Sequence, residues 1–459
     1  MELALNTSMS RHSRGDNILY IFGNVPYWFV ANKQLDPIMR KLQQGVDQSK
    51  LFSDISDPTQ NLVEDLIKMG IISQGGNSSG DIERLVPKKR IWNVHDIAEF
   101  ELTLNCNLRC KHCYIDAGRS NGEEIGFPTI QRTLDDLVDI HKDDMQTKRI
   151  VLTGGEPFIR KDIVDIVNLI KKRGFKTLIN SNGLLIRDEH LDQLRGYDGL
   201  QICVSLDGSK DSHEKIRGTG TYNPTVKQIR KISEAGIKTA INMLCHSENY
   251  KELSQVISDT LDIDLQGVNP VPVVSMGRAN DYDIKPVPEK ELFREIFRLL
   301  KNPIYSQRMA RTSLLNFMGA LACNVKSHYC GTGTRGTFFI SYKGDVYPCP
   351  NMRDNLFKLG NVNEDSLKRI INGNLVIENL EKLSVDNMND QCPKCDVKYF
   401  CGGYCRGETF FNTGNVKAPY IRCGEYKDGI LEAMWELSSN PQLYKEKAKE
   451  FLDNSRKTK

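Results

Sequence analysis

Short runs of apolar and β-branched residues alternate with amphipathic helical segments from Glu99 onward. Repeated βα units of this kind fold into a parallel sheet or an open barrel, because each helix carries the chain back to begin the next strand in the same direction. Right-handed connections then place the ends of all the strands on one rim, where loop residues can converge. Strands are predicted at residues 100–104, 148–153, 175–180, 200–206, 237–244 and 266–273. Helical segments between them include residues 129–142 and 162–173.

A separate small module is predicted before this alternating region. Residues 17–31, NILYIFGNVPYWFVA, are rich in β-branched and aromatic residues and contain two short strands around Gly23-Asn24. Two helical stretches follow, each ended by a glycine. This pattern predicts a winged-helix module at residues 14–75, a size at which a domain can just fold alone. The composition of SQGGNSSGD is that of a flexible linker, which is placed at residues 76–98.

The chain becomes rich in loops after about residue 320, and seven cysteines lie from Cys330 to Cys423. So little regular apolar periodicity indicates a domain that relies on bound metals for its stability. An amphipathic helix is predicted within DGILEAMWELSS, close to the end of the chain. The resulting division is a core at residues 99–285, a cysteine-rich domain at 315–440 and a tail at 441–459.

The charge balance excludes several classes of protein. Lys and Arg number 62 against 59 Asp and Glu, which leaves a formal net charge of only +3. Residues 1–98 contain eleven residues of each sign, so the winged-helix module lacks the basic surface of a DNA reader. No apolar stretch has the length of a membrane span or the layout of a signal peptide. We expect a cytoplasmic protein with no nucleic-acid or membrane partner.

Cytoplasmic thiols stay reduced, so clustered cysteines favour metal binding or catalysis. Cys106, Cys110 and Cys113 lie within NCNLRCKHCYIDAG, in the loop directly after the first predicted strand of the core. Zinc usually takes four protein ligands, whereas three thiolates without a nearby fourth fit an iron-sulfur cube in which one iron stays open. Two other interpretations remain: unligated buried thiols, and zinc with His112 as a fourth ligand.

The motif CNLRCKHC resembles the CxxxCxxC signature of radical S-adenosylmethionine (SAM) enzymes. The resemblance implies a partial (β/α)6 barrel, a [4Fe-4S] cluster on the three cysteines, and SAM bound at the open iron through its methionine moiety. TGGEP, at the end of the second predicted strand, is similar to the family's GGEP loop, which meets the SAM amino group. That loop comprises Gly154, Gly155, Glu156 and Pro157. Two glycines in succession let a backbone approach a ligand closely.

Two further loops on the same rim are weaker candidates. NSNG ends the third predicted strand and VSLDG ends the fourth. In similar enzymes such loops contact the ribose and carboxylate of SAM, which makes Ser181, Asn182 and Ser205 candidates, although a turn at a strand end explains each of them equally well. His112 occupies the position where the family often places an aromatic ring against the adenine. RGTGTY and SMGRA also resemble motifs of relatives, and no role is assigned to them.

The remaining clustered cysteines match the spacing of a SPASM domain, which is CX9-15GX4C, then CX2CX5CX3C, then C. A zinc ribbon would need a different second spacing and would leave three thiols unexplained. Relatives hold two auxiliary [4Fe-4S] clusters in this domain, so the resemblance implies three clusters in all. One auxiliary cluster would take Cys392, Cys395, Cys401 and Cys423; the other would take Cys330, Cys349 and Cys405, with Cys323 as the expected fourth ligand. Without Cys323, an open iron could accept a substrate thiolate.

The N-terminal module resembles the PqqD-like element that captures a leader peptide by adding it as a strand to an exposed sheet edge. Together the three parts resemble radical SAM maturases of ribosomally made peptides, of the sactipeptide and ranthipeptide type that installs thioether crosslinks. The expected partners are a precursor peptide with its leader and an electron donor such as flavodoxin or ferredoxin. The alternatives are a carbon-carbon or ether crosslink, a peptide-derived cofactor, and a redox-sensing regulator.

The residue after Cys349 bears on the substrate. Sulfatase-maturing relatives carry an aspartate base directly after the corresponding cysteine, whereas Pro350 occupies that position here, which disfavours a sulfatase maturase. Asp354 is the nearest carboxylate downstream, and no role is assigned to it. The sequence therefore leaves the catalytic base unidentified.

Overall fold

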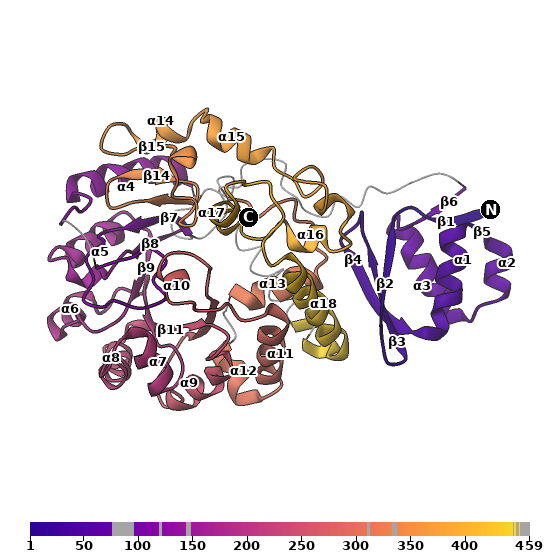
Figure 1. Cartoon of the computed structure of the whole chain (residues 1–459), viewed down its shortest axis with the longest axis horizontal. Helices are drawn as coiled ribbons and strands as arrows, with labels where there is room; N and C mark the ends of the chain where they lie inside the picture. The colour runs from indigo at the N-terminus through magenta and orange to yellow at the C-terminus, as the bar shows by residue number, and fades with distance from the viewer. Residues whose placement is uncertain are drawn as a thin grey trace.

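The computed structural model describes residues 1–75, 96–118, 122–143, 148–309, 313–332 and 337–443, with 445, 446 and 449. Figure 1 shows a small N-terminal module beside a larger body, in which helices surround a long sheet. Almost all of the predicted linker and most of the predicted tail lie outside the described residues.

The N-terminal module has a hydrophobic core of its own, formed by two small sheets and three helices. The first sheet has the strand order β5-β1-β6 and the second has the order β2-β3-β4. The strands are β1 (Glu2–Leu5), β2 (Met9–Arg14), β3 (Asn17–Phe22), β4 (Tyr27–Asn32), β5 (Val46–Asp47) and β6 (Ile72–Gln74). The helices are α1 (Asp36–Gln44), α2 (Gln48–Ser53) and α3 (Asp57–Lys68).

The module is larger than the sequence predicted. The predicted hairpin forms as β3 and β4, but β1 and β2 also belong to the module and begin before residue 14. β2 has the sequence MSRHSR, which carries too few apolar residues to indicate a strand on its own. Three helices replace the two predicted stretches, because Asp47 caps a separate helix with its side chain. The winged-helix assignment stays a prediction.

Six strands form where the core strands were predicted, and they pair side by side in chain order as a parallel sheet. The first of them begins at Asp96 and shares only two residues with the predicted range 100–104. The strands are β7 (Asp96–Glu101), β8 (Arg149–Thr153), β9 (Lys176–Ser181), β10 (Leu200–Ser205), β11 (Lys238–Cys245) and β12 (Gly267–Pro272). The helices of this region are α4 (Phe127–His141), α5 (Ile163–Lys172), α6 (Asp188–Leu194), α7 (Lys210–Arg217), α8 (Tyr222–Glu234), α9 (Leu253–Asp259), α10 (Arg278–Asp281), α11 (Glu289–Leu300), α12 (Pro303–Met309) and α13 (Ser313–Ala322). The parallel order agrees with the predicted βα architecture.

The two faces of this sheet differ in chemistry because successive side chains of a strand point to opposite faces. One face is apolar and packs into the main core with the helices, through side chains such as Phe100, Leu152 and Ile202. The other face, called the inner face below, carries polar side chains in each strand. Its polar members are Glu99, Glu101, Thr153, Asn180, Ser205, Asn242 and Asn269.

The cysteine-rich part is joined directly to the core sheet. β13 (Phe338–Ile340) pairs in parallel with β7, and β14 (Asp345–Tyr347) and β15 (Gly360–Asn361) continue the sheet in antiparallel fashion. The remaining helices are α14 (Leu367–Ile371), α15 (Leu375–Glu381), α16 (Lys398–Cys401), α17 (Arg406–Thr413) and α18 (Cys423–Ser439). The predicted C-terminal helix is α18, and it packs against α11 of the core.

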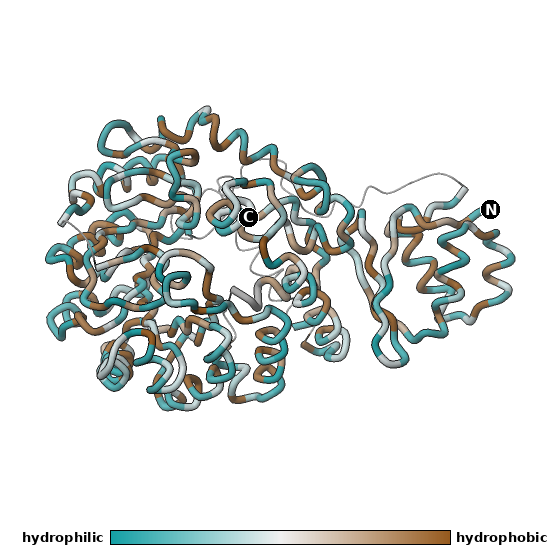
Figure 2. The backbone as a smooth tube through the Cα atoms, in the orientation of Figure 1, coloured by the Kyte–Doolittle hydropathy of each residue, from teal (hydrophilic) through white to brown (hydrophobic). Residues whose placement is uncertain are grey.

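The N-terminal module contacts the larger body through β2 and β4. The Trp28 indole N–H donates to the carbonyl of Leu321 at 3.1 Å. The Arg14 guanidinium pairs with Glu432 of α18 at 2.7 Å and lies 4.8 Å from the Trp435 ring centroid. No described helix is long and apolar enough to cross a membrane. Figure 2 shows hydrophobic residues interrupted by hydrophilic ones along the described helices.

Candidate functional site

The three cysteines of CNLRCKHC lie in the loop that follows β7, as predicted. The backbone N–H of Leu108 donates to Cys106 Sγ at 3.4 Å, and that of Ala117 donates to Cys113 Sγ at 3.4 Å. Backbone N–H groups directed at sulfur stabilise thiolates and tune the potential of a cluster bound to them. This donor set fits an iron-sulfur cluster.

Arg278, from the motif SMGRA, fixes the shape of the cysteine loop. Its buried guanidinium donates to the carbonyls of Cys110 and Ala117, each at 2.8 Å, and pairs with Asp116 at 2.6 Å. The sequence assigned no role to this motif. Its arginine holds the loop backbone closed.

Burial and the charge of Cys113 raise the pKa of both other cysteines of this loop. Burial raises the pKa of Cys106 to about 11, and Cys110 and Cys113 add to that shift. Within the described residues, no three His, Cys, Asp or Glu side chains lie close enough to bind a single metal ion. An iron-sulfur cube holds its thiolates further apart than one ion does, because each thiolate binds a different iron.

Burial and neighbouring cysteines raise the pKa of later cysteines within two sets, and the assignment of these sets to two clusters stays a prediction. Burial raises the pKa of Cys349 to about 12, and the next contributors are Cys330 and Cys405. Burial and the other three cysteines of its set likewise raise the pKa of Cys401 to about 12. Those three are Cys423, Cys395 and Cys392. Cys323 directly follows α13 and is half-buried, and its role as a ligand stays a prediction.

The two glycines of TGGEP lie against the backbone that leads into the cysteine loop. A Cβ atom on Gly154 would lie 2.4 Å from the carbonyl oxygen of Thr103, and one on Gly155 would lie 2.2 Å from that of Asn105. The N–H of Gly155 donates to the Thr103 carbonyl at 2.8 Å. Only glycine fits in this contact. The close approach is therefore to the chain's own backbone, which the sequence interpretation did not foresee.

Glu156 joins the TGGEP loop to the NSNG loop. Its carboxylate is buried and accepts from the Ser181 hydroxyl at 2.8 Å, the Asn182 N–H at 2.8 Å and the Phe158 N–H at 3.1 Å. The Asn182 amide in turn donates to Asn107 in the cysteine loop at 2.8 Å. Three of the predicted residues are thus brought together with the cysteines. Pro157, which is also buried, begins the short 3-10 helix Pro157–Ile159.

A buried ion pair lies on the other side of the cysteine loop. Arg217, from RGTGTY, pairs with Asp207 of VSLDG at 2.6 Å and donates to Cys110 Sγ at 3.8 Å. Its guanidinium is also 3.5 Å from His112 Nε2. Burial and the Arg217 charge lower the pKa of His112 to about 3, so this imidazole is neutral at physiological pH. Sequence reasoning missed this ion pair, although both of its motifs had been noted.

The inner face of the sheet supplies polar groups that the sequence interpretation did not select. Asn242 donates to Asn180 at 3.2 Å, and Asn269 donates to Asn242 at 3.1 Å, so side-chain amides of β9, β11 and β12 are linked across four neighbouring strands. Ser205, which had been selected, is paired with Asn242 in the sheet register. Buried parallel strands are usually apolar on both faces. Asparagines in such strands were therefore an available signal.

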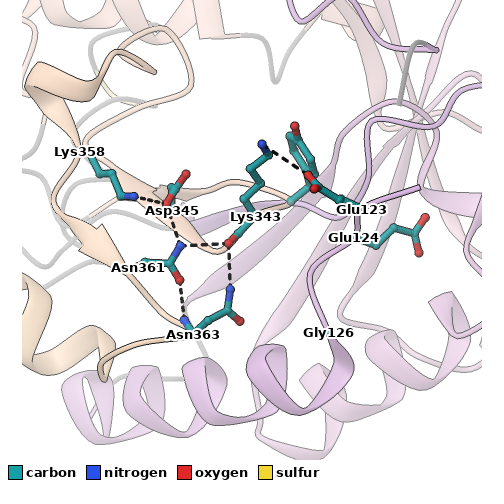
Figure 3. A pocket seen from close by; sticks show the side chains of 9 residues that line it. Glu123, Glu124, Gly126, Lys343, Asp345, Lys358, Asn361 and Asn363 are labelled. Atoms are coloured by element: carbon teal, nitrogen blue, oxygen red, sulfur yellow. Dashed lines mark hydrogen bonds and ion pairs between the residues drawn. The ribbon is translucent and has the colours of Figure 1, made fainter. Parts of the chain in front are cut away.

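A polar hollow of about 500 Å³ lies away from the cysteines, where the β13–β14 turn meets the loop before α4 (Figure 3). Its charged groups are already paired: Lys343 with Glu123 at 3.4 Å, and Lys358 with Asp345 at 2.5 Å. Asn361 donates to Asp345 at 2.7 Å. The Lys343–Glu123 pair joins the cysteine-rich part to the core, and no cysteine lines the hollow.

Two family matches cover the parts of the chain that carry these sites. Residues 100–270 match the Radical SAM superfamily, and residues 330–396 match SPASM, an iron-sulfur cluster-binding domain. The chain is a radical SAM enzyme. The radical SAM match contains β8 to β11, parts of β7 and β12, and the cysteine, TGGEP and NSNG loops. The cofactors that the two domains imply are [4Fe-4S] clusters and SAM.

Known proteins resemble this enzyme over most of its length. It is 28% identical over 316 residues to the antilisterial bacteriocin subtilosin biosynthesis protein AlbA of Bacillus subtilis. The alignment covers 68% of this chain and 67% of AlbA. It is 24% identical to an AdoMet-dependent heme synthase of Methanosarcina barkeri, in an alignment that covers 72% of this chain and 96% of that protein.

Among solved structures, Streptococcus suis SuiB bound to S-adenosylmethionine matches with a TM-score of 0.59 at 16% identity. That match covers 92% of this chain and 99% of SuiB. The part of this chain that lies outside the match is shorter than the N-terminal module. The fold shared with SuiB therefore includes some of that module.

Proposed function

We propose that this radical SAM enzyme installs an intramolecular thioether crosslink in a ribosomally made precursor peptide. The observation that carries the peptide substrate is the N-terminal module, which is docked on the larger body and falls partly within the fold shared with SuiB. SuiB has been solved with its precursor peptide SuiA bound, and AlbA is named for the biosynthesis of a bacteriocin. The heme synthase is matched almost completely and leaves more than a quarter of this chain unmatched.

The module would act as a PqqD-like recognition element. The sheet β2-β3-β4 has two edges, and a leader peptide would add to an edge as a further strand. The module shares contacts with α18, which begins at Cys423, so the captured peptide would be held beside the cysteine-rich domain. Pairing along an edge of this small sheet would fix the leader and leave the core peptide free to reach the inner face of the core sheet.

Three [4Fe-4S] clusters are proposed. The first would be held by Cys106, Cys110 and Cys113, and with SAM it supplies the radical that removes a hydrogen atom from the substrate. The auxiliary clusters would be held by the two cysteine sets described above, with Cys323 as the fourth ligand of the set that contains Cys349. An electron donor such as flavodoxin or ferredoxin, and a cytoplasmic location, belong to the same proposal.

The chain's own residues would bind and orient SAM. The Gly154–Gly155 backbone lies directly against the cysteine loop, where it can meet the SAM amino group. Glu156 fixes the position of Ser181 and Asn182, which would face the ribose and carboxylate together with Ser205. The neutral His112 ring would pack against the adenine.

Thiol counting tests the type of crosslink. A short precursor peptide encoded beside this enzyme would be incubated anaerobically with enzyme and SAM, and then alkylated with iodoacetamide. We expect a product that is two hydrogens lighter and has one alkylatable thiol fewer for each crosslink. A lighter product with all its thiols free would instead identify a carbon-carbon or ether crosslink or a peptide-derived cofactor.

A further inference from the structure

One carboxylate on the inner face has no hydrogen-bond partner among the described residues. Glu99 lies in the middle of β7, between Val151 of β8 and Phe339 of β13 in the sheet register. Its side chain is half-buried. Part of this residue is therefore accessible to solvent.

The groups around Glu99 connect the two cysteine-bearing domains. Glu101, next on the same face, accepts from Arg353 at 2.6 Å, and its second oxygen is buried without a partner among the described residues. The Arg353 guanidinium lies 5.5 Å from the ring centroid of Tyr114 and 5.3 Å from that of Phe339. Tyr114 directly follows Cys113, and Arg353 lies four residues after Cys349.

These neighbours also set the charge state of Glu99. Burial raises the pKa of Glu99 to about 7, with further increases from Asp96 and Glu101, whereas Arg353 partly offsets them. Asp96 is itself paired with Arg149 at 2.5 Å. The remaining titratable neighbour is Tyr114, which stays neutral because burial and Glu99 raise its pKa. A base works best when its pKa is near the operating pH.

We propose that Glu99 is the catalytic base that takes the proton released when the crosslink closes. This inference rests on the proposed function. In the closing step the cysteine S–H bond breaks and a carbon-sulfur bond forms at the substrate carbon radical. The proton goes to the Glu99 carboxylate, and one electron goes to an oxidised iron-sulfur centre, which is reduced. Arg353 and Glu101 are positioning residues for this step.

Other carboxylates near the two cysteine groups are less suited to the role. Glu156 is fully engaged by three hydrogen bonds. Asp354 is exposed, and its side chain caps a short 3-10 helix by accepting from the Leu356 N–H at 2.9 Å. Position 350, directly after Cys349, is a proline. Glu99 alone among these combines the inner face, partial access and a free carboxylate.

The test compares Glu99→Gln, Glu99→Asp and the matched control Asp354→Asn in the holoenzyme with its precursor peptide. Three quantities are measured between pH 5.5 and 8.5: deoxyadenosine formed, crosslinked peptide formed, and peptide affinity by anisotropy. For Glu99→Gln we expect deoxyadenosine formation within about threefold of the parent enzyme and unchanged affinity, whereas crosslink closure falls by about 10²- to 10⁴-fold. Asp354→Asn should match the parent enzyme.

The pH profile supplies a second test that needs no stable variant. Crosslink closure by the parent enzyme should rise to a plateau above about pH 7, and Glu99→Asp should keep a rising profile at a lower rate. A flat profile in the parent enzyme, or full closure by a folded Glu99→Gln, would overturn the assignment. If the parent enzyme forms deoxyadenosine and no crosslink with any peptide, the proposed function fails instead.

Discussion

Asp207 and Arg217 form a buried ion pair of 2.6 Å, and the guanidinium of this pair reaches to 3.8 Å from Cys110 Sγ. The two residues come from VSLDG and RGTGTY, which follow different elements of the radical SAM domain. Burial alone would raise the pKa of Asp207, but the charge and hydrogen bond of Arg217, together with His112 and His213, outweigh it and hold the pKa at about 2. A permanently charged pair therefore lies beside the cysteine loop.

Replacing Asp207 with Asn should leave the Arg217 charge buried without its ion-pair partner. Asn can still accept from the Leu244 N–H, which donates to Asp207 at 2.9 Å, so mainly the charge is lost. We expect the free energy of unfolding to fall by about 3–5 kcal/mol, because a buried charge is left without its partner. Anaerobic denaturant unfolding followed by circular dichroism measures this loss.

The exposed pair Lys215–Glu248, also 2.6 Å long, is the control for that measurement. Glu248→Gln should leave the free energy of unfolding close to that of the parent enzyme, because exposed ion pairs are solvated and screened. Equal losses for Asp207→Asn and Glu248→Gln would contradict the role given to burial.

Gly155→Ala should disrupt SAM binding. The added Cβ would lie 2.2 Å from the carbonyl oxygen of Asn105 and 2.7 Å from its carbon, and backbone cannot move aside without shifting the cysteine loop. We expect SAM affinity to fall at least about tenfold, which corresponds to about 1.4 kcal/mol. Isothermal titration of the reconstituted enzyme measures the affinity. Gly126→Ala, whose Cβ would make only ordinary contacts, should bind SAM like the parent.

Glu99→Gln should stabilise the protein above neutral pH. The folded pKa of about 7 exceeds the ordinary value of a glutamate, so folding binds a proton that the unfolded chain has lost. The parent enzyme therefore loses stability as pH rises from about 4.3 to 7 and levels off above that. We expect the advantage of Glu99→Gln in unfolding free energy to grow by about 1–2 kcal/mol between pH 5.5 and 8.5. A constant difference across that range would show that Glu99 has an ordinary pKa.

The sequence revealed the parts of the fold that depend on regular patterns. The six core strands follow from apolar runs alternating with helices, and the separation of the later cysteines into two sets follows from motif spacing and family resemblance. β2 was missed because its strand is built from polar residues that pair with β3 and with the larger body. Its stability comes from tertiary contacts, which no local pattern encodes.

The site shows the same limit. Motifs identified the cysteines and the TGGEP and NSNG loops, but the function of Glu156 as a link between loops depends on distances that spacing does not give. Glu99 was missed because one acidic residue in a strand has no meaning until the face it points to is known. Arg353 lies 252 residues from Glu101 in the chain, so only the fold brings them together.

The central claim is that this radical SAM enzyme crosslinks a peptide, and product stoichiometry tests it most directly. Anaerobic turnover of the precursor peptide should yield one deoxyadenosine for each peptide that becomes two hydrogens lighter. The variant with Cys106, Cys110 and Cys113 all replaced by Ala should yield neither product. Deoxyadenosine from that variant, or peptide of unchanged mass alongside deoxyadenosine from the parent enzyme, would contradict the account.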